Sequence, residues 1–296
     1  MKDHGMQLGP LGVWFFTETM RSPEAAEFAG RLESLGYSAL WMPETMGRNP
    51  FVHAAYLFTQ TERLIIATGI ANIYHRHPGM TKQSQMTLAE QSGGRFLLGL
   101  GVSHAPLVSG ARGLEYGKPV ATMRAYLEGM ASSPYASIPP EETPLTVLAA
   151  LGPKMLALAG EQADGAHPYW TTPEHTAQAR EILGPDKLLC VEQKVCLETD
   201  PGKARTAARA ALSMYAGLPN YANNWKRLGF TDDDIANGGS DRLIDGLVAW
   251  GDEKAIAARV QAHRDAGADH VCIQPLLAEG APGAVDWNAL EALAPR

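Results

Sequence analysis

The feature that most constrains the fold is an alternation of short apolar runs with longer amphipathic segments along the chain. This order is typical of parallel strands joined by crossover helices. Eight runs have the length and composition of strands: Leu8–Phe16, Tyr37–Met42, Leu64–Ile70, Phe96–Gly101, Leu145–Ala150, Gly165–Pro168, Leu188–Leu197 and His270–Pro275. Eight strands with eight crossovers favour a closed (β/α)8 TIM barrel over an open sheet.

Helix-start and helix-stop residues bracket the amphipathic segments. A Ser, Thr or Asp followed by Pro is typical of a first helical turn, and a glycine often follows the last turn. The expected helices run from Ser22-Pro23 to Gly36, from Thr172-Pro173 to Gly184-Pro185, from Asp200-Pro201 onward, and over Lys254–Ala266 to Gly267.

The length of 296 residues suits one barrel, and no linker or repeat divides the chain. We therefore expect a single domain over residues 1–296. The stretch Gly217–Trp250 exceeds what a crossover needs and predicts a helical insertion between the seventh and eighth strands. Insertions of this kind often shape a substrate pocket.

The charge pattern and the N-terminal residues limit the possible partners. The formal net charge is -7, and no stripe of Lys or Arg could neutralise a phosphate backbone, so we do not expect a nucleic-acid partner. No apolar stretch approaches the ~20 residues of a membrane span, and Met1–Gly5 has no signal-peptide core. We expect a cytoplasmic enzyme without membrane partners.

The sequence gives no indication of a metal site. Cys190, Cys196 and Cys272 lack metal-ligand spacing, and buried reduced thiols fit best. The run His75-Arg76-His77 also lacks a zinc spacing, and we interpret these residues as parts of a loop and a helix start.

A barrel carries its chemistry at the carboxyl ends of its strands. Here those ends read Trp41-Met42-Pro43-Glu44, then ATGIANIYHRHPG from Ala67, GGRFLLGLGVSH up to His104, and LAALGPKMLALAGEQADGAHPYW from Leu148. These stretches, in this order, resemble the luciferase-like monooxygenase superfamily, and in particular its branch that uses the deazaflavin coenzyme F420. The resemblance spans nearly the whole chain and implies a homodimer.

The resemblance implies a cofactor site at the strand ends. A cis peptide at Gly69-Ile70 would press against the central ring; alternatively, Gly69 is merely a turn glycine. Free amides after Gly152, with Lys154, would bind the cofactor's phosphate, although Gly-Pro also opens helices for structural reasons. The expected cofactor-binding residues are Trp14, Gly69, Ile70, Ala71, Asn72, Gly101, Val102, Ser103, Leu151, Gly152, Pro153, Lys154, Met155, Tyr169 and Trp170.

Proton transfer needs a group that titrates near neutral pH, and the two candidate catalytic residues are Glu44 and His104. Related deazaflavin dehydrogenases carry Asp-His after the second strand and a Glu after the fourth, so the two side-chain types look exchanged here. This departure suggests a different substrate. The plain alternative is that Glu44 pairs with Arg48 and that His104 is a rim residue.

The resemblance implies hydride transfer between F420 and a small organic substrate, either an alcohol or carbonyl or an enone. Three alternatives stay open: an FMN-dependent monooxygenase using reduced flavin and oxygen, a non-catalytic flavin-binding barrel, and a hydrolase or lyase without a redox cofactor. No GxGxxG follows a first strand, so a separate nicotinamide domain is not expected.

Overall fold

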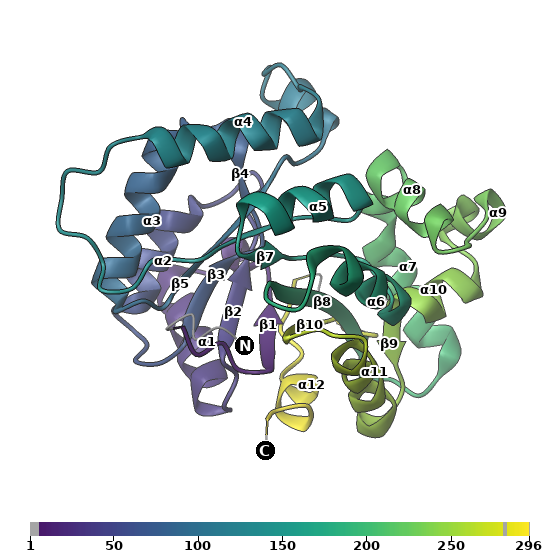
Figure 1. Cartoon of the computed structure of the whole chain (residues 1–296). Helices are drawn as coiled ribbons and strands as arrows, with labels where there is room; N and C mark the ends of the chain where they lie inside the picture. The colour runs from purple at the N-terminus through teal and green to yellow at the C-terminus, as the bar shows by residue number, and fades with distance from the viewer. Residues whose placement is uncertain (1–5, 281–282, 296) are drawn as a thin grey trace.

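The computed structural model describes residues 6–280 and 283–295 and shows a closed barrel of parallel strands surrounded by helices (Figure 1). Strand β10 pairs with both β1 and β8, and this closes the barrel. The strands are β1 (Leu11–Trp14), β2 (Ala39–Met42), β3 (Ile65–Thr68), β5 (Phe96–Gly101), β6 (Thr146–Leu148), β7 (Gly165–Ala166), β8 (Leu188–Cys196) and β10 (His270–Pro275). The predicted barrel is confirmed.

Helices cover the outside of the barrel (Figure 1). They are α1 (Ser22–Ser34), α2 (Pro50–Phe58), α3 (Pro78–Ser92), α4 (Pro119–Ser132), α5 (Pro153–Gln162), α6 (Pro173–Leu183), α7 (Pro201–Ala216), α11 (Glu253–Asp265) and α12 (Trp287–Ala292). Thr172 and Asp200 cap α6 and α7 as predicted. The N-cap of α1 is Arg21 rather than Ser22, and its backbone amide donates to Glu24 Oε2 at 2.8 Å.

Side chains along each strand belong alternately to two apolar layers, because successive side chains point to opposite faces of the sheet. In β2, Ala39 and Trp41 belong to the core inside the barrel, whereas Leu40 and Met42 belong to the core between strands and helices. Cys190, Cys196 and Cys272 are buried free thiols, as expected.

The third strand of the structure ends two residues before its predicted end at Ile70. Strand β3 stops at Thr68, and the short β4 (Ala71–Asn72) resumes pairing with β5 after the intervening Gly69 and Ile70. Most other predicted strands are a few residues too long, since residues that flank a barrel strand are also apolar.

The predicted insertion forms a separate group of elements beside α7 (Figure 1). It contains α8 (Pro219–Arg227), α9 (Asp232–Ile235), α10 (Asp241–Leu247) and the short strand β9 (Val248–Trp250). Strand β9 pairs with β8, so the segment is not purely helical. Trp225 lies in an apolar cluster that the insertion shares with α7, which contributes Leu212.

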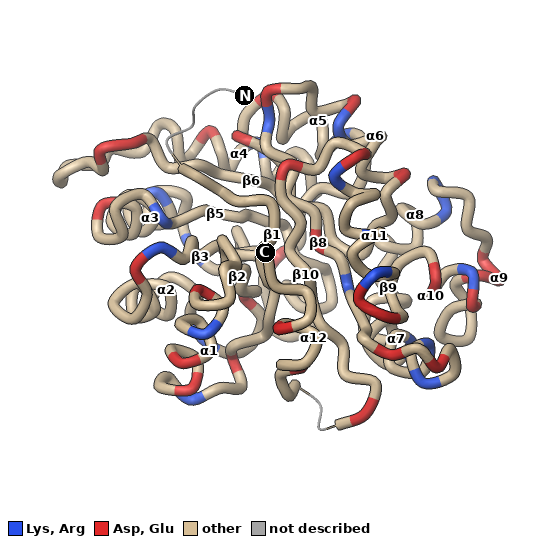
Figure 2. The backbone as a smooth tube through the Cα atoms, turned by 90° about the horizontal axis from the view of Figure 1, so that it is seen from below, with Lys and Arg blue, Asp and Glu red and all other residues tan. Residues whose placement is uncertain are grey.

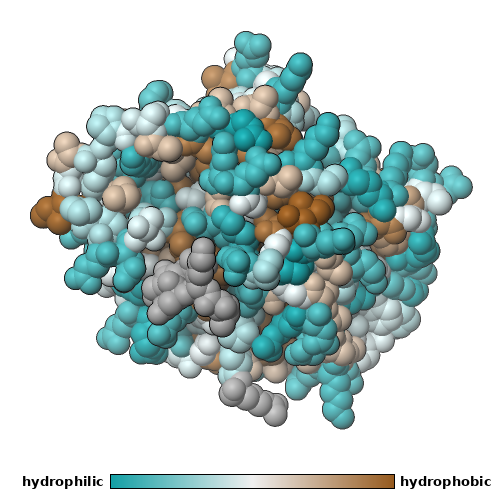
Figure 3. Space-filling model, in the orientation of Figure 1, coloured by the Kyte–Doolittle hydropathy of each residue, from teal (hydrophilic) through white to brown (hydrophobic). Residues whose placement is uncertain are grey.

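The surface carries charges of both signs. Figure 2 shows Lys and Arg interspersed with Asp and Glu along the helices and loops. The face drawn in Figure 3 is mostly hydrophilic, with small hydrophobic patches. None of the helices in the described part of the chain has the length and apolar character needed to span a membrane.

Candidate functional site

A cavity of about 590 Å³ opens at the carboxyl ends of the strands. Strand ends and the insertion both contribute to its wall. Of the predicted site residues, those that line it are Trp14, Glu44, Gly69, Ile70, Gly101, Val102, Ser103, His104, Leu151, Gly152, Pro153, Lys154, Met155 and Tyr169. The cavity is the size of an ordinary small-molecule or cofactor site.

Three predicted cofactor-binding residues do not line the cavity. Ala71 is buried in the outer core, and Asn72 caps a short 3-10 turn over Ile73–His75. The Trp170 side chain packs into the cluster of the insertion, and its backbone amide donates to Glu192 Oε2 at 3.2 Å. Each of them is close in sequence to a residue that lines the cavity, but this did not predict that it lines the cavity too, because neighbouring side chains point in different directions.

The tip of β3 carries the expected cis peptide between Gly69 and Ile70. The Trp14 indole N–H donates to the Gly69 carbonyl at 2.9 Å, and the Gly69 amide donates to Met42 O at 2.8 Å. A Cβ on Gly69 would lie 2.6 Å from Trp14 Nε1. Gly69 is therefore more than a turn residue, because this close contact leaves no room for a side chain.

Glycines in β5 allow that strand to approach the tip of β3. A Cβ on Gly99 would lie 1.9 Å from the Thr68 carbonyl oxygen, and one on Gly101 would lie 2.5 Å from Ile70 Cδ1. The Gly-Leu-Gly pattern is thus explained by packing against β3.

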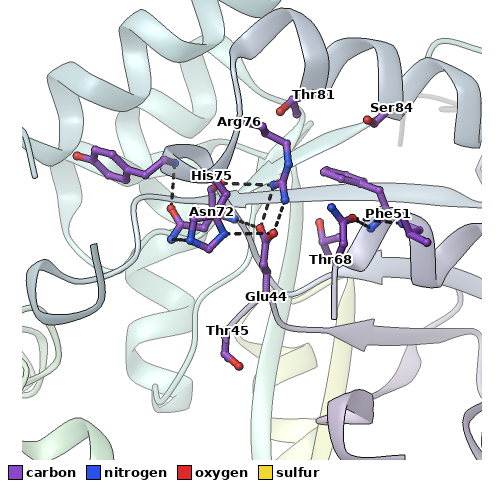
Figure 4. Close-up of polar contacts among 12 residues, drawn as sticks. Glu44, Thr45, Phe51, Thr68, Asn72, His75, Arg76, Thr81 and Ser84 are labelled. Carbon is purple, nitrogen blue, oxygen red and sulfur yellow. Dashed lines mark hydrogen bonds and ion pairs between the residues drawn. The ribbon is translucent and has the colours of Figure 1, made fainter. Parts of the chain in front are cut away.

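Glu44 lies at the centre of a polar cluster beside this segment (Figure 4). Its carboxylate accepts two hydrogen bonds from the Arg76 guanidinium, one of them at 2.9 Å. It accepts a third from the backbone amide of Asn72 at 2.8 Å. His75 Nδ1 lies 3.2 Å from the same carboxylate. The backbone amide of Glu44 donates to Ile70 O at 3.1 Å. Glu44 therefore holds the chain at Ile70 and in the turn that follows it.

The surroundings keep Glu44 ionised. Burial alone would raise the pKa of its carboxyl, but the hydrogen bonds and positive charge of Arg76, with the Asn72 amide, outweigh burial and lower it. The alternative pairing with Arg48 is wrong, because Arg48 instead donates to Met20 O. The interpretation of His75 and Arg76 as ordinary loop residues missed these contacts.

His104 follows β5 and lines the same cavity. Its ring centroid lies 5.6 Å from that of Tyr221 on α8. Burial lowers the pKa of His104 below its usual value, and a hydrogen bond with Asn220 opposes this shift only in part. His104 is therefore mostly neutral at pH 7 and able to accept a proton.

The first turn of α5 forms another part of the wall. Gly152 is its N-cap and Pro153, which has no N–H, begins the helix. The amides of Met155 and Leu156 both donate to Gly152 O at 3.1 Å, so the expected set of free amides after Gly152 is reduced to that of Lys154. The Arg227 guanidinium lies over Gly152, 3.4 Å from where a Cβ would be, and donates to Asn224 Oδ1 at 3.1 Å. Lys154 also lines the cavity. Together these groups favour an anion.

Sequence reasoning missed Arg227, His167, Tyr215 and Tyr221, which all line the cavity. Arg227 and Tyr221 belong to the insertion, which was predicted to shape the pocket but gave no residue-level signal. His167 stood in the quoted stretch GAHPYW and could have been selected as a polar residue at a strand end.

No group of three or more His, Cys, Asp or Glu side chains that could hold a metal ion occurs within residues 6–280 and 283–295.

Comparison with known proteins identifies the family. The model of the luciferase-like monooxygenase family matches residues 8–270. The chain belongs to this family. A relative from Mycobacterium tuberculosis, named "Putative coenzyme F420-dependent oxidoreductase Rv3520c", is 26% identical over 311 aligned positions, covering 84% of this chain and 89% of the relative.

Solved structures share the fold of this luciferase-like chain. The coenzyme F420-dependent tetrahydromethanopterin reductase from Methanopyrus kandleri superposes with a TM-score of 0.77 at 17% identity, covering 97% of each chain. An FMN complex of the oxygenating constituent of 3,6-diketocamphane monooxygenase from Pseudomonas putida gives 0.70 at 15% identity, covering 97% of this chain and 96% of the other. These likenesses show the fold.

Proposed function

We propose that this protein transfers a hydride between coenzyme F420 and a small organic alcohol, carbonyl or enone. The observation that carries the proposal is the cavity, which brings the Gly69-Ile70 cis segment, His104 and the start of α5 into one wall. The similarity to an F420-dependent oxidoreductase over most of the chain supports this choice of cofactor.

The residues present fit a planar ring with an anionic tail. Trp14, Ile70 and Tyr169 provide apolar and aromatic surface around the tip of β3. Arg227 and Lys154, the latter with its side chain and its backbone amide at the start of α5, would hold the phosphate. When bound, the oxidised deazaflavin accepts a hydride, and its reduced form donates one.

We assign proton transfer to His104. An alcohol that gives up a hydride from carbon must also release its hydroxyl proton, and neutral His104 can take that proton. The reverse reaction returns it. Glu44 serves a different purpose, because its carboxylate oxygens already accept hydrogen bonds from Arg76 and Asn72. We therefore propose that Glu44 positions the segment that supports the ring.

The test mixes the purified protein with F420, with FMN, or with neither, and follows cofactor fluorescence. We expect F420 fluorescence to change on binding, and its visible absorbance to bleach when a secondary alcohol such as cyclohexanol is added. His104→Ala should bind F420 but not bleach it. The matched control is His77→Ala, because His77 is exposed, lies outside the cavity and caps α3.

Each other outcome points elsewhere. A non-catalytic barrel would be favoured if F420 binds but no alcohol bleaches it, and if no carbonyl or enone restores the absorbance of reduced F420. Tighter binding of FMN with oxygen consumption would favour the monooxygenase alternative. Failure to bind either ring would overturn the proposed function.

A further inference from the structure

His167 is a buried side chain of the cavity wall whose second nitrogen has no partner. It follows β7, lines the cavity and is 2% exposed. Its Nδ1 lies 2.8 Å from the Cys190 carbonyl oxygen, while its Nε2 makes no hydrogen bond within the part of the chain that the structure describes. Burying a polar atom without a partner is costly, so such an atom calls for an explanation.

The hydrogen bond to Cys190 decides the protonation of the ring. A carbonyl oxygen can only accept, so Nδ1 must carry the hydrogen and donate it. Nε2 of the neutral ring is then a bare acceptor. Burial lowers the pKa of His167 to about 4, so this form persists at neutral pH. His167 is accordingly suited to accept a hydrogen bond rather than to shuttle protons.

The ring of His167 is held in one orientation at the tip of β3. It stacks on Trp41 with ring centroids 4.3 Å apart and planes inclined by 13°. Nε2 lies 3.2 Å from the position that a Cβ on Gly69 would occupy. The unpartnered nitrogen thus adjoins the segment against which the cofactor ring is proposed to rest.

Other buried histidines show that an open nitrogen is not the rule in this protein. His270 Nε2 accepts from the Trp41 indole N–H at 3.0 Å, and its Nδ1 lies 2.6 Å from Gly9 O. Both nitrogens of His263 are partnered, by Thr176 and Gln193, each at 2.8 Å. His175 also has an open nitrogen, but it does not line the cavity.

We propose that His167 Nε2 accepts a hydrogen bond from the imide N–H of the bound ring, and so fixes which edge of the ring lies beside Gly69. This inference rests on the proposed function. Flavin and deazaflavin both carry one imide N–H between two carbonyls, so His167 would orient either ring without choosing between them. Its role is therefore positioning and binding, separate from the proton chemistry at His104.

Two substitutions distinguish the roles of the two ring nitrogens of His167. His167→Asn places an amide N–H near Nδ1, which keeps a donor for the Cys190 carbonyl but removes the acceptor. His167→Gln places an amide oxygen near Nε2 and so restores an acceptor. His263→Asn is the matched control, because His263 is equally buried and lies outside the cavity.

The probes are F420 or FMN, whichever the wild-type protein binds more tightly, and the same ring methylated at the imide nitrogen. Dissociation constants are measured by fluorescence titration, and melting temperatures of the ligand-free variants report on folding. Methylation removes the donor on the ligand just as His167→Asn removes the acceptor on the protein.

We expect His167→Asn to weaken binding of the parent ring about tenfold, in line with one lost hydrogen bond. His167→Gln should recover part of this loss, and His263→Asn should lower the melting temperature without changing affinity. The methylated ring should bind the wild type weakly and lose no further affinity in His167→Asn.

Equal affinity of wild type and His167→Asn for the parent ring would overturn the inference alone. So would a methylated ring that binds as well as the parent, or one that loses a further tenfold in His167→Asn. Failure of the wild type to bind any of these rings would overturn the proposed function, and this inference with it.

Discussion

Replacing Arg76 with Met tests whether the Glu44 cluster holds the tip of β3 in place. The Glu44 and Arg76 side chains are 7% and 12% exposed, so the pair is largely removed from water. Removing one member of a buried pair typically costs about 3–5 kcal/mol. Because the Asn72 amide and His75 still contact the carboxylate, we expect the lower end, about 3 kcal/mol.

The assay is urea unfolding at pH 7, followed by tryptophan fluorescence, for the wild type, Arg76→Met, Glu44→Gln and the double variant. The double variant should lose at least about 1 kcal/mol less than the sum of the two single losses, since it contains no unpaired buried charge. Additive losses would refute the reasoning, because they would mean that the two side chains do not interact.

The pH dependence gives an independent check. In the wild type the lowered pKa of Glu44 contributes stability above the ordinary carboxyl value of 4.5, and this contribution is lost as the pH falls through the lowered pKa. In Arg76→Met the main lowering influence is gone, and burial should raise that pKa above 4.5. The stability deficit of the variant should therefore shrink as the pH falls from 7 through this window. A deficit that is constant between pH 7 and 4 would contradict the assignment.

Three further predictions concern His104, Arg227 and Lys194. The rate of alcohol oxidation should stay level down to pH 6.5 and fall below it, as the pH drops through the lowered pKa of His104; a kcat that falls already above pH 6.5, or that shows no fall before the protein unfolds in acid, would exclude His104 as the base. Arg227→Met should weaken binding of the phosphorylated ring about tenfold but leave binding of the same ring without phosphate unchanged, which paired titrations can measure. Lys194 Nζ lies 3.0 Å from Glu192 Oε1, and both side chains are buried. Lys194→Met should therefore destabilise the fold by about 3–5 kcal/mol because it leaves the Glu192 carboxylate buried without a cation, and adding Glu192→Leu should recover much of that loss in urea unfolding.

The barrel was predictable because its signal is local and repeated. Each strand needs only a few apolar residues, and each helix carries its own start and stop residues, such as Thr172 and Asp200. The cis segment at Gly69 was predictable only through the family resemblance, since a glycine at a strand end has several structural uses. Tertiary contacts then shortened most strands without altering their order.

The partners within the site were not predictable from sequence. Glu44 lies 32 positions before Arg76, and a nearer cation, Arg48, was the natural candidate for an ion pair. Only the closure of β2 against β3 brings the loop after β3 to Glu44. Arg227 lies far from Gly152 in sequence, and its approach depends on how the insertion packs beside the barrel. Contacts of this kind follow from the assembled fold rather than from local pattern.

The distribution of charge around the cavity bears on the orientation in which an anionic cofactor would bind. On the side of β2 and β3, the charge of Glu44 is neutralised by Arg76, and the wall beside it is formed by Trp14 and Ile70. On the side of α5 and α8, Arg227 and the N-terminal end of α5 provide positive potential. A ligand with an apolar ring and a phosphate tail would lose favourable contacts at both ends if it were reversed. Charge therefore favours one end-to-end orientation, whereas the edge of the ring that faces Gly69 must be selected by a directional contact, which is the contribution we assign to His167.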